Sequence, residues 1–342
     1  ALASLMVAMG TAGQGWGLAV SVLAYVLIGI GAGASGTSLL ALLASGCAPQ
    51  RRAAAATITW LMMIFGIAVT SGVIGALLDP YSPRRLMAIV AVVTIGAVLL
   101  TAAAIHGIER RVIPARLPDE TPLLKGLAEV WSEPRTRIFT VFIFLSMTAF
   151  FLQELILEPY AGLVFAYTPG QSTSLSGAQH GGMFVGMLAV GIAVSGLRIG
   201  TLRLWVTAGC LGSAISLAVI AALGQTGVGL LTPAVTILGV FNGMFAIASI
   251  GAMMQLAGQG RAGREGTRMG VWGASQAIAQ GLGGFAGAAL VDVLRLSGDT
   301  ADAFSLVFLI EAALFLAAGL MAWRIIDGGR LRAAAPNLVP GE

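Results

Sequence analysis

Charged residues are scarce in this 342-residue chain: they make up 10% of it, whereas ordinary globular proteins carry about 25%. Hydrophobic residues make up 57%, and the mean hydropathy is +0.92. This balance excludes a soluble globular fold. The chain has 19 Lys and Arg against 15 Asp and Glu, but nearly all of the basic residues fall in short connections between apolar runs. They therefore indicate membrane topology, and no nucleic-acid partner is expected.

Cysteine is almost absent, with only Cys47 and Cys210, which lie far apart in apolar surroundings. Neither a disulfide framework nor a Cys-x-x-Cys metal or redox site is therefore supported. The sequence also lacks P-loop, HExxH and zinc-ligand spacings. Gly31, Gly33 and Gly36 fit GxGxxG, but they lie inside an apolar run with no strand before them, so helix packing is the expected role. No soluble-type catalytic site is readable, and no enzymatic activity is expected.

Long apolar runs dominate what is present. About 20 apolar residues cross a hydrocarbon core about 30 Å thick, and such runs must be helical because lipid offers the backbone no hydrogen-bond partner. Residues 1–9 are apolar from the first position, with no initiator Met or cleavage site, so we expect that the natural start is missing. Nine full spans are predicted, over residues 18–46, 54–78, 86–106, 138–166, 180–197, 204–224, 229–256, 270–293 and 303–325.

The basic residues sort to one side of these spans. Of the 19 Lys and Arg, only Arg84, Arg85 and Arg295 fall on the other side. The positive-inside rule therefore predicts that the longest connection, residues 107–137, and the C-terminal tail are cytoplasmic. The stretch 121–131 has one apolar face, which predicts an amphipathic helix at the membrane surface within this connection.

The sequence contains an internal repeat. When the sequence is aligned with itself so that Arg52 lies opposite Arg264, Trp60 lies opposite Trp272. The preceding apolar span also matches in this alignment, without a gap. Two consecutive helices recur in the same orientation, as in the parallel halves of major facilitator transporters. We therefore predict an all-helical major facilitator-type bundle of 12 helices, with helices 1, 2 and most of 3 missing. Its expected parts are residues 1–106 (end of helix 3 to helix 6), 107–137 (cytoplasmic loop), 138–325 (helices 7 to 12) and 326–342 (cytoplasmic tail).

Ionisable residues at membrane depth are costly, so each is a candidate for function. Glu154 and Glu158 are four residues apart and are expected to share one helix face. That face either is functional or bonds to neighbouring helices, and both alternatives stay open. Gln276 and Gln280, with Asn242, are candidates for interhelical hydrogen bonds. Other polar groups in the spans are Gln153, Gln255 and Glu311.

His180 is expected to open a span after a loop over residues 168–179. A neutral imidazole can ligate a metal, including the magnesium of a chlorophyll, although most lone histidines near a membrane interface do not. Both alternatives stay open for His180, and it is the one candidate metal ligand. His106, at the predicted cytoplasmic end of its span, is expected to be solvated.

Two stretches carry a family resemblance. The first runs from Glu154-Leu-Ile-Leu-Glu-Pro-Tyr through Thr168-Pro-Gly to Gln179-His-Gly-Gly, and the second is Gly263-Arg-Glu-Gly-Thr-Arg-Met-Gly-Val-Trp-Gly-Ala-Ser-Gln. Together they closely resemble the PucC and LhaA family of phototrophic bacteria. This family is a branch of the major facilitator fold that is also called the bacteriochlorophyll delivery family.

The resemblance implies a light-harvesting assembly factor in the bacterial inner or intracytoplasmic membrane, with bacteriochlorophyll as the expected ligand. Its implied partners are antenna polypeptides and the reaction-centre core complex. The pigment-binding candidates chosen from the residues themselves are His180, Glu154, Glu158 and Gln179. The alternative function is a secondary transporter that moves a small solute by alternating access.

Overall fold

The computed structural model describes residues 14–46, 52–107, 128–129, 131–197, 199–257, 265–296 and 298–326. The secondary structure of these residues is helical. Nine of their segments are long and apolar enough to cross a membrane, as predicted. The chain is therefore a multi-pass helical membrane protein. Three segments discussed above lie outside the described residues: the apolar start at 1–9, most of the amphipathic stretch at 121–131, and the tail from 327.

Contacts divide the chain into two units, and neither unit is one continuous stretch. Unit 1 comprises Ala1–Met62, Val73–Asp119 and Thr168–Gln171. Unit 2 comprises Met63–Gly72, Glu120–Tyr167 and Ser172–Glu342.

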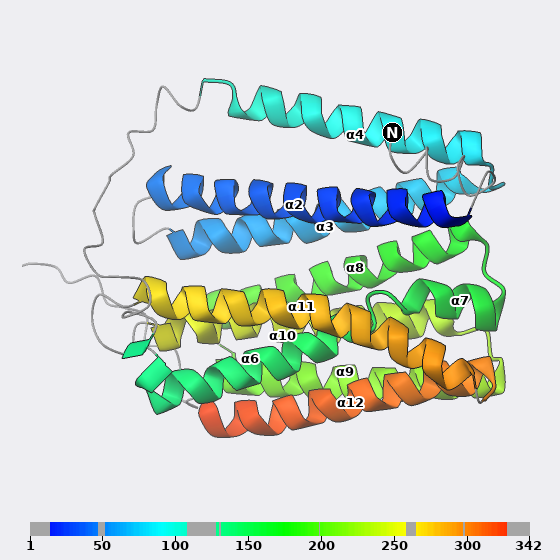
Figure 1. The fold of residues 1–342 in the computed structure, drawn as a ribbon. Helices are drawn as coiled ribbons and strands as arrows, with labels where there is room; N and C mark the ends of the chain where they lie inside the picture. The colour runs from blue at the N-terminus through cyan, green and yellow to red at the C-terminus, as the bar shows by residue number, and fades with distance from the viewer. Residues whose placement is uncertain are drawn as a thin grey trace, which may run out of the picture. The chain divides into compact units, whose positions relative to one another are not determined.

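Unit 1 is built mainly from α2 (Gln14–Gly46), α4 (Pro83–Ile105) and parts of α3 (Arg52–Leu78), drawn in blue to cyan in Figure 1. The Ser82 side chain accepts a hydrogen bond from the backbone N–H of Arg85 and caps the first turn of α4. No residue of α4 is buried. Its apolar surface has the character of a helix that meets hydrocarbon.

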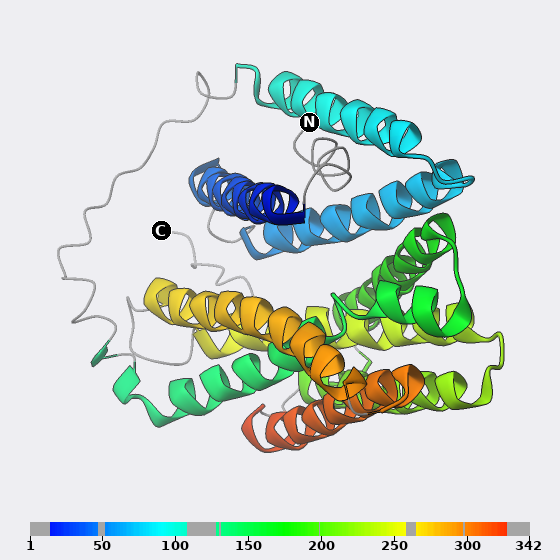
Figure 2. The same ribbon diagram turned by 45° about the vertical axis from the view of Figure 1, so that its right-hand side comes forward.

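Unit 2 holds most of the buried core, and Figures 1 and 2 show its long helices side by side. Aromatic rings join several of them. Tyr160 packs edge-on against Phe308, with 4.9 Å between ring centroids, and Phe139 packs edge-on against Trp272 at 4.9 Å. The helices are α6 (Pro134–Leu152), α7 (Leu157–Phe165), most of α8 (Pro169–Gly191) with its π-helical end η3 (Ile192–Gly196), α9 (Leu202–Thr226), α10 (Leu231–Ala257), α11 (Glu265–Arg295) and α12 (Thr300–Ile325).

The predicted span 138–166 is two helices joined by a turn. α6 already begins at Pro134, at the first position of a helix where proline is favoured. It ends at Leu152, and α7 begins at Leu157. Pro159 explains the break, because proline has no N–H and its ring clashes with the carbonyl four residues earlier.

The prediction of a loop over residues 168–179 is wrong, because α8 begins at Pro169. Hydropathy failed here because the first half of α8 is polar. Within unit 1, Asp79 stabilises the start of this helix: its carboxylate accepts hydrogen bonds from the Thr168 hydroxyl and from the backbone N–H of Gly170. A carboxylate at a helix N-terminus satisfies free backbone donors and complements the helix dipole.

Glycines let α8 and α10 approach each other closely. A Cβ at Gly182 or Gly186 of α8 would overlap backbone carbonyl groups of α10. A Cβ at Gly239 or Gly243 of α10 would in turn overlap carbonyl groups of α8. The contact between these two helices therefore depends on the absence of side chains on both. In contrast, nothing described lies within 4 Å of a Cβ added at Gly31, Gly33 or Gly36, so the helix-packing role expected for these glycines stays a prediction.

Candidate functional site

His180 lies inside α8 and does not open it. The earlier expectation about its place was wrong because the polar half of the helix resembled a loop. The side chain is half-buried, and its Nδ1 atom lies 2.9 Å from the backbone carbonyl oxygen of Ser176, one turn earlier.

This contact determines the tautomer of the neutral imidazole. A carbonyl oxygen can only accept a hydrogen bond, so Nδ1 carries the proton. The lone pair of His180 is then on Nε2. An imidazole held through one nitrogen, with the other nitrogen available, has the arrangement found in metal-ligating histidines.

Two carboxylates accompany His180. The Ser176 hydroxyl donates a hydrogen bond of 2.6 Å to Oε1 of Glu158, so Ser176 contacts both the imidazole and the acid. Glu154 interacts electrostatically with both His180 and Glu158. Glu154, Glu158, Ser176 and His180 thus form one polar cluster, which we call the His180 cluster.

The two glutamates do not share the face of one continuous helix, contrary to expectation. Glu154 lies in the turn between α6 and α7, and Glu158 lies in the first turn of α7. Both are exposed. The break before Pro159 separates their helical registers, but the turn keeps both acids close to α8.

The position of Gln179 on α8 places it outside the His180 cluster. It is buried, with 8% of its surface exposed. Neighbouring residues of a helix project about 100° apart, so Gln179 and His180 point in different directions.

The remaining sequence candidates lie elsewhere. Asn242 of α10 accepts a hydrogen bond of 2.7 Å from the Ser213 hydroxyl of α9, which links two helices in the core. Gln276 is half-buried and Gln280 is exposed, both on α11. His106 is exposed at the end of α4, where solvation was expected.

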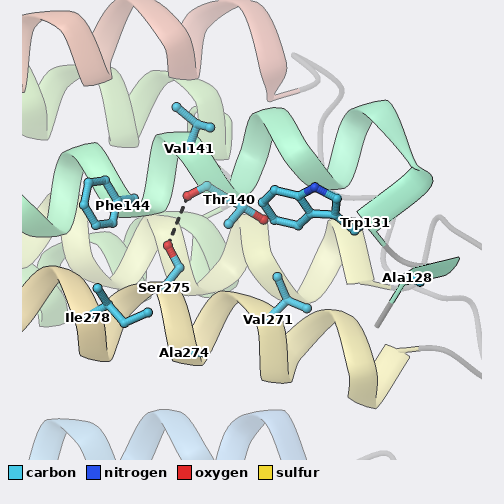
Figure 3. Close-up of a pocket in the computed structure, with 9 residues that line it drawn as sticks. All are labelled: Ala128, Trp131, Thr140, Val141, Phe144, Val271, Ala274, Ser275 and Ile278. Atoms are coloured by element: carbon cyan, nitrogen blue, oxygen red, sulfur yellow. Dashed lines mark hydrogen bonds between the residues drawn. The ribbon is translucent and has the colours of Figure 1, made fainter. Parts of the chain in front are cut away.

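A separate apolar groove of about 600 Å³ lies between α6 and α11 (Figure 3). The indole of Trp131 stands at one end of it. The Ser275 hydroxyl donates a hydrogen bond of 3.2 Å to the backbone carbonyl of Thr140. Because this hydroxyl already has a partner, the groove presents a mostly apolar lining. The other lining residues are Ala128, Val141, Phe144, Val271, Ala274 and Ile278. This groove offers no strong metal ligand.

A buried ion pair near this groove was not predicted. Arg268 of α11 is 1% exposed, and its guanidinium donates to both carboxylate oxygens of Glu133, at 2.9 and 2.8 Å. The Thr136 hydroxyl donates to the same carboxylate at 2.8 Å. From the sequence, Arg268 counted as one of the basic residues on the predicted cytoplasmic side and as part of the second stretch that carries the family resemblance. No hydropathy signal marks which of those residues is buried.

No group of three or more His, Cys, Asp or Glu side chains that could hold a bare metal ion occurs among the residues searched, which are those with described positions. The His180 cluster offers a different kind of site, with one imidazole. A single ligand suffices for a metal that already has four nitrogen ligands from a tetrapyrrole ring. In such a site Nε2 of His180 would hold the metal, and the two acids would lie beside the imidazole.

Comparison with known proteins gives consistent results. A family model described as PUCC protein matches residues 2–329. The chain is 60% identical over 343 aligned positions to the "Bacteriochlorophyll synthase 44.5 kDa chain" of Rhodobacter capsulatus, covering all of this chain and 80% of that protein. It is 28% identical to "Protein PucC" of the same species, over 92% of this chain and 70% of that protein. "Protein PucC" of Cereibacter sphaeroides is 27% identical, over 88% of this chain and 66% of that protein.

Proposed function

The chain belongs to the PUCC protein family, and from this membership and the geometry around His180 we propose that it is an assembly factor for light-harvesting complexes. In this proposal it binds bacteriochlorophyll in the membrane and delivers it to antenna polypeptides. Relatives named for bacteriochlorophyll and PucC tie the family to photosynthetic pigment and complex assembly.

The observation that carries the pigment step is the hydrogen bond between His180 and the Ser176 carbonyl. Because this bond holds the proton on Nδ1, Nε2 of His180 would ligate the central magnesium of the pigment. When bound, the pigment would supply the light-absorbing ring, and His180 would hold and orient it.

Glu154 and Glu158 support this role electrostatically. A negative charge near a ligating imidazole makes it a stronger electron donor to the metal. Ser176 keeps Glu158 beside α8 through its 2.6 Å hydrogen bond. We therefore assign the two acids a positioning and tuning role, with Nε2 of His180 as the ligand.

The proposed setting is the bacterial inner or intracytoplasmic photosynthetic membrane, with the 107–137 connection and the C-terminus cytoplasmic. The distribution of Lys and Arg supports this orientation. The internal repeat supports two parallel halves of the major facilitator type. The proposed partners are antenna polypeptides and the reaction-centre core complex, which the protein meets in the bilayer.

Purification from phototrophically grown cells tests the proposal. The full-length protein, extracted in mild detergent, should carry bacteriochlorophyll in its absorbance spectrum and should co-purify with antenna polypeptides. The same protein should be enriched with immature complexes and scarce in mature ones. Protein that carries no pigment and no antenna polypeptide would contradict the proposal.

An enzymatic role is the competing possibility, because the name of one relative contains the word synthase. We propose that this chain acts without chemical turnover. Purified protein incubated with bacteriochlorophyll precursors should leave them unchanged when the pigments are separated by chromatography. Formation of a new pigment that depends on the protein would favour the enzymatic role.

A further inference from the structure

Glu311 lies near the middle of α12 and has no exposed surface. Neither of its carboxylate oxygens has a hydrogen-bond partner within the described part of the chain. A charged side chain at the centre of a membrane helix is energetically costly. The presence of an acid at this position therefore requires an explanation that the His180 cluster does not give.

Two aromatic contacts define where Glu311 lies. It is three residues after Phe308 and four before Phe315, so the three side chains share one face of α12. Phe308 packs against Tyr160 of α7, and Phe315 packs against Phe245 of α10, with 5.8 Å between ring centroids. Glu311 is thus located in the interior of unit 2, between these two contacts.

Asn242 lies at the same depth. Both α10 and α12 run antiparallel to α9, because residues later in α10 or α12 meet residues earlier in α9. The helices α10 and α12 are therefore parallel. Asn242 precedes Phe245 by about one turn, as Glu311 precedes Phe315. The Nδ2 atom of Asn242 is buried without a hydrogen-bond partner among the described residues.

Gln153 is the third polar residue of this region. It follows α6 directly and is fully buried, and neither its Oε1 nor its Nε2 atom has a partner among the described residues. Tyr160, about two turns further along the chain, contacts Phe308. Because α12 packs against both α6 and α7, Gln153, which lies between these two helices in the chain, is placed beside α12.

No cation reaches this depth from the helices packed against Glu311, as far as the structure describes them. The helix α10 carries no charged residue. Glu154 lies in the turn between α6 and α7, and on the helices other than α10 every charged residue except Glu311 itself lies in the first or last turn. Those residues are Arg135 and Arg137 of α6, Glu158 of α7, Arg203 of α9, Glu265, Arg268, Asp292 and Arg295 of α11, and Asp302 and Arg324 of α12.

We propose that Glu311 is a proton-binding site whose protonated carboxyl forms a buried polar layer with Asn242 and Gln153. The hydrogen-bonding capacities are complementary. A protonated carboxyl supplies one donor and one acceptor, Asn242 supplies the Nδ2 donor, and Gln153 supplies an acceptor and a donor. None of these atoms is hydrogen-bonded directly to another in the described structure, so the layer needs bridging molecules, and water is the ligand small enough for this. The site is independent of the pigment step.

Infrared spectroscopy of the purified full-length protein tests this site. The wild type should show a carbonyl stretching band of a protonated carboxylic acid, and Glu311→Gln should lose it. Glu158→Gln is the control and should keep the band, because that acid bonds to Ser176 near the protein surface. Asn242→Leu leaves Glu311 in place and should shift the band to higher wavenumber through loss of a hydrogen bond.

The wild-type spectrum alone can overturn the proposal. Absence of a protonated-acid band would show that Glu311 is ionised, even if Glu311→Gln fails to fold. Persistence of the band in folded Glu311→Gln would assign it to another acid. A band unchanged in Asn242→Leu would remove Asn242 from the layer.

Discussion

The Nδ1 atom of His180 lies 2.9 Å from the backbone carbonyl oxygen of Ser176. This bond uses the main chain, so substitution of the Ser176 side chain should preserve it. The hydroxyl of the same residue donates to Glu158. Ser176 therefore contacts His180 and Glu158 through two different groups, and mutation can separate them.

Removal of the hydroxyl should weaken pigment binding without abolishing it. Ser176→Ala releases Glu158 but leaves His180 with its tautomer, and Glu158→Gln removes the charge itself. We expect each to lower bacteriochlorophyll affinity by up to about tenfold, which corresponds to about 1.4 kcal/mol. Pigment titration with purified protein measures this effect. Ser174→Ala, on a different side of α8, is the matched control and should bind as the wild type does.

Alanine substitution should change the stability of the protein very differently at two adjacent glycines of α8. A Cβ at Gly182 would overlap the backbone carbonyl of Thr236, so Gly182→Ala must push α8 and α10 apart at a cost of about 1–3 kcal/mol. Nothing lies within 4 Å of a Cβ at Gly181. Gly181→Ala should therefore be neutral, or stabilising by up to about 1 kcal/mol, because alanine favours helix. Unfolding in detergent compares them, and equal effects would refute the close contact of α8 and α10.

The Arg268–Glu133 pair should contribute to the stability of the α6–α11 contact. Arg268→Ala leaves a partly buried carboxylate without its bidentate partner, and we expect a loss of about 1–3 kcal/mol, because Glu133 keeps some solvent access. Arg268→Lys should recover only part of this, since an ammonium group cannot match the two-pronged geometry. Unfolding midpoints provide the measurement. Arg137→Ala, an exposed arginine of α6, should have little effect.

Hydropathy was sufficient to predict the nine spans, because the cost of exposing backbone to lipid leaves few alternatives to helix. It failed for the first half of α8, where tertiary contacts around Asp79 stabilise a polar helix start. The break after α6 had a visible signal in Pro159. That signal was missed because the mean hydropathy stays high over the whole of residues 134–165, across the break.

The candidate site was predictable only in part. The residue types His180, Glu154 and Glu158 were recognisable as unusual in apolar spans, and the structure brings them together. Ser176 was missed, because a residue one turn before His180 becomes a candidate only if both are in a helix. The burial of Arg268 could not be predicted, since its partner Glu133 is far away in the sequence.

The chain contains only two histidines, which permits a direct test of pigment ligation. His180→Ala and His106→Ala should be purified in parallel from phototrophic cells, with unfolding midpoints to confirm that both are folded. The most direct measurement is the molar ratio of bacteriochlorophyll to protein. Our account predicts that His180→Ala loses at least about tenfold in this ratio, that added imidazole restores part of it, and that His106→Ala matches the wild type. Equal pigment ratios in all three folded proteins would contradict ligation by His180.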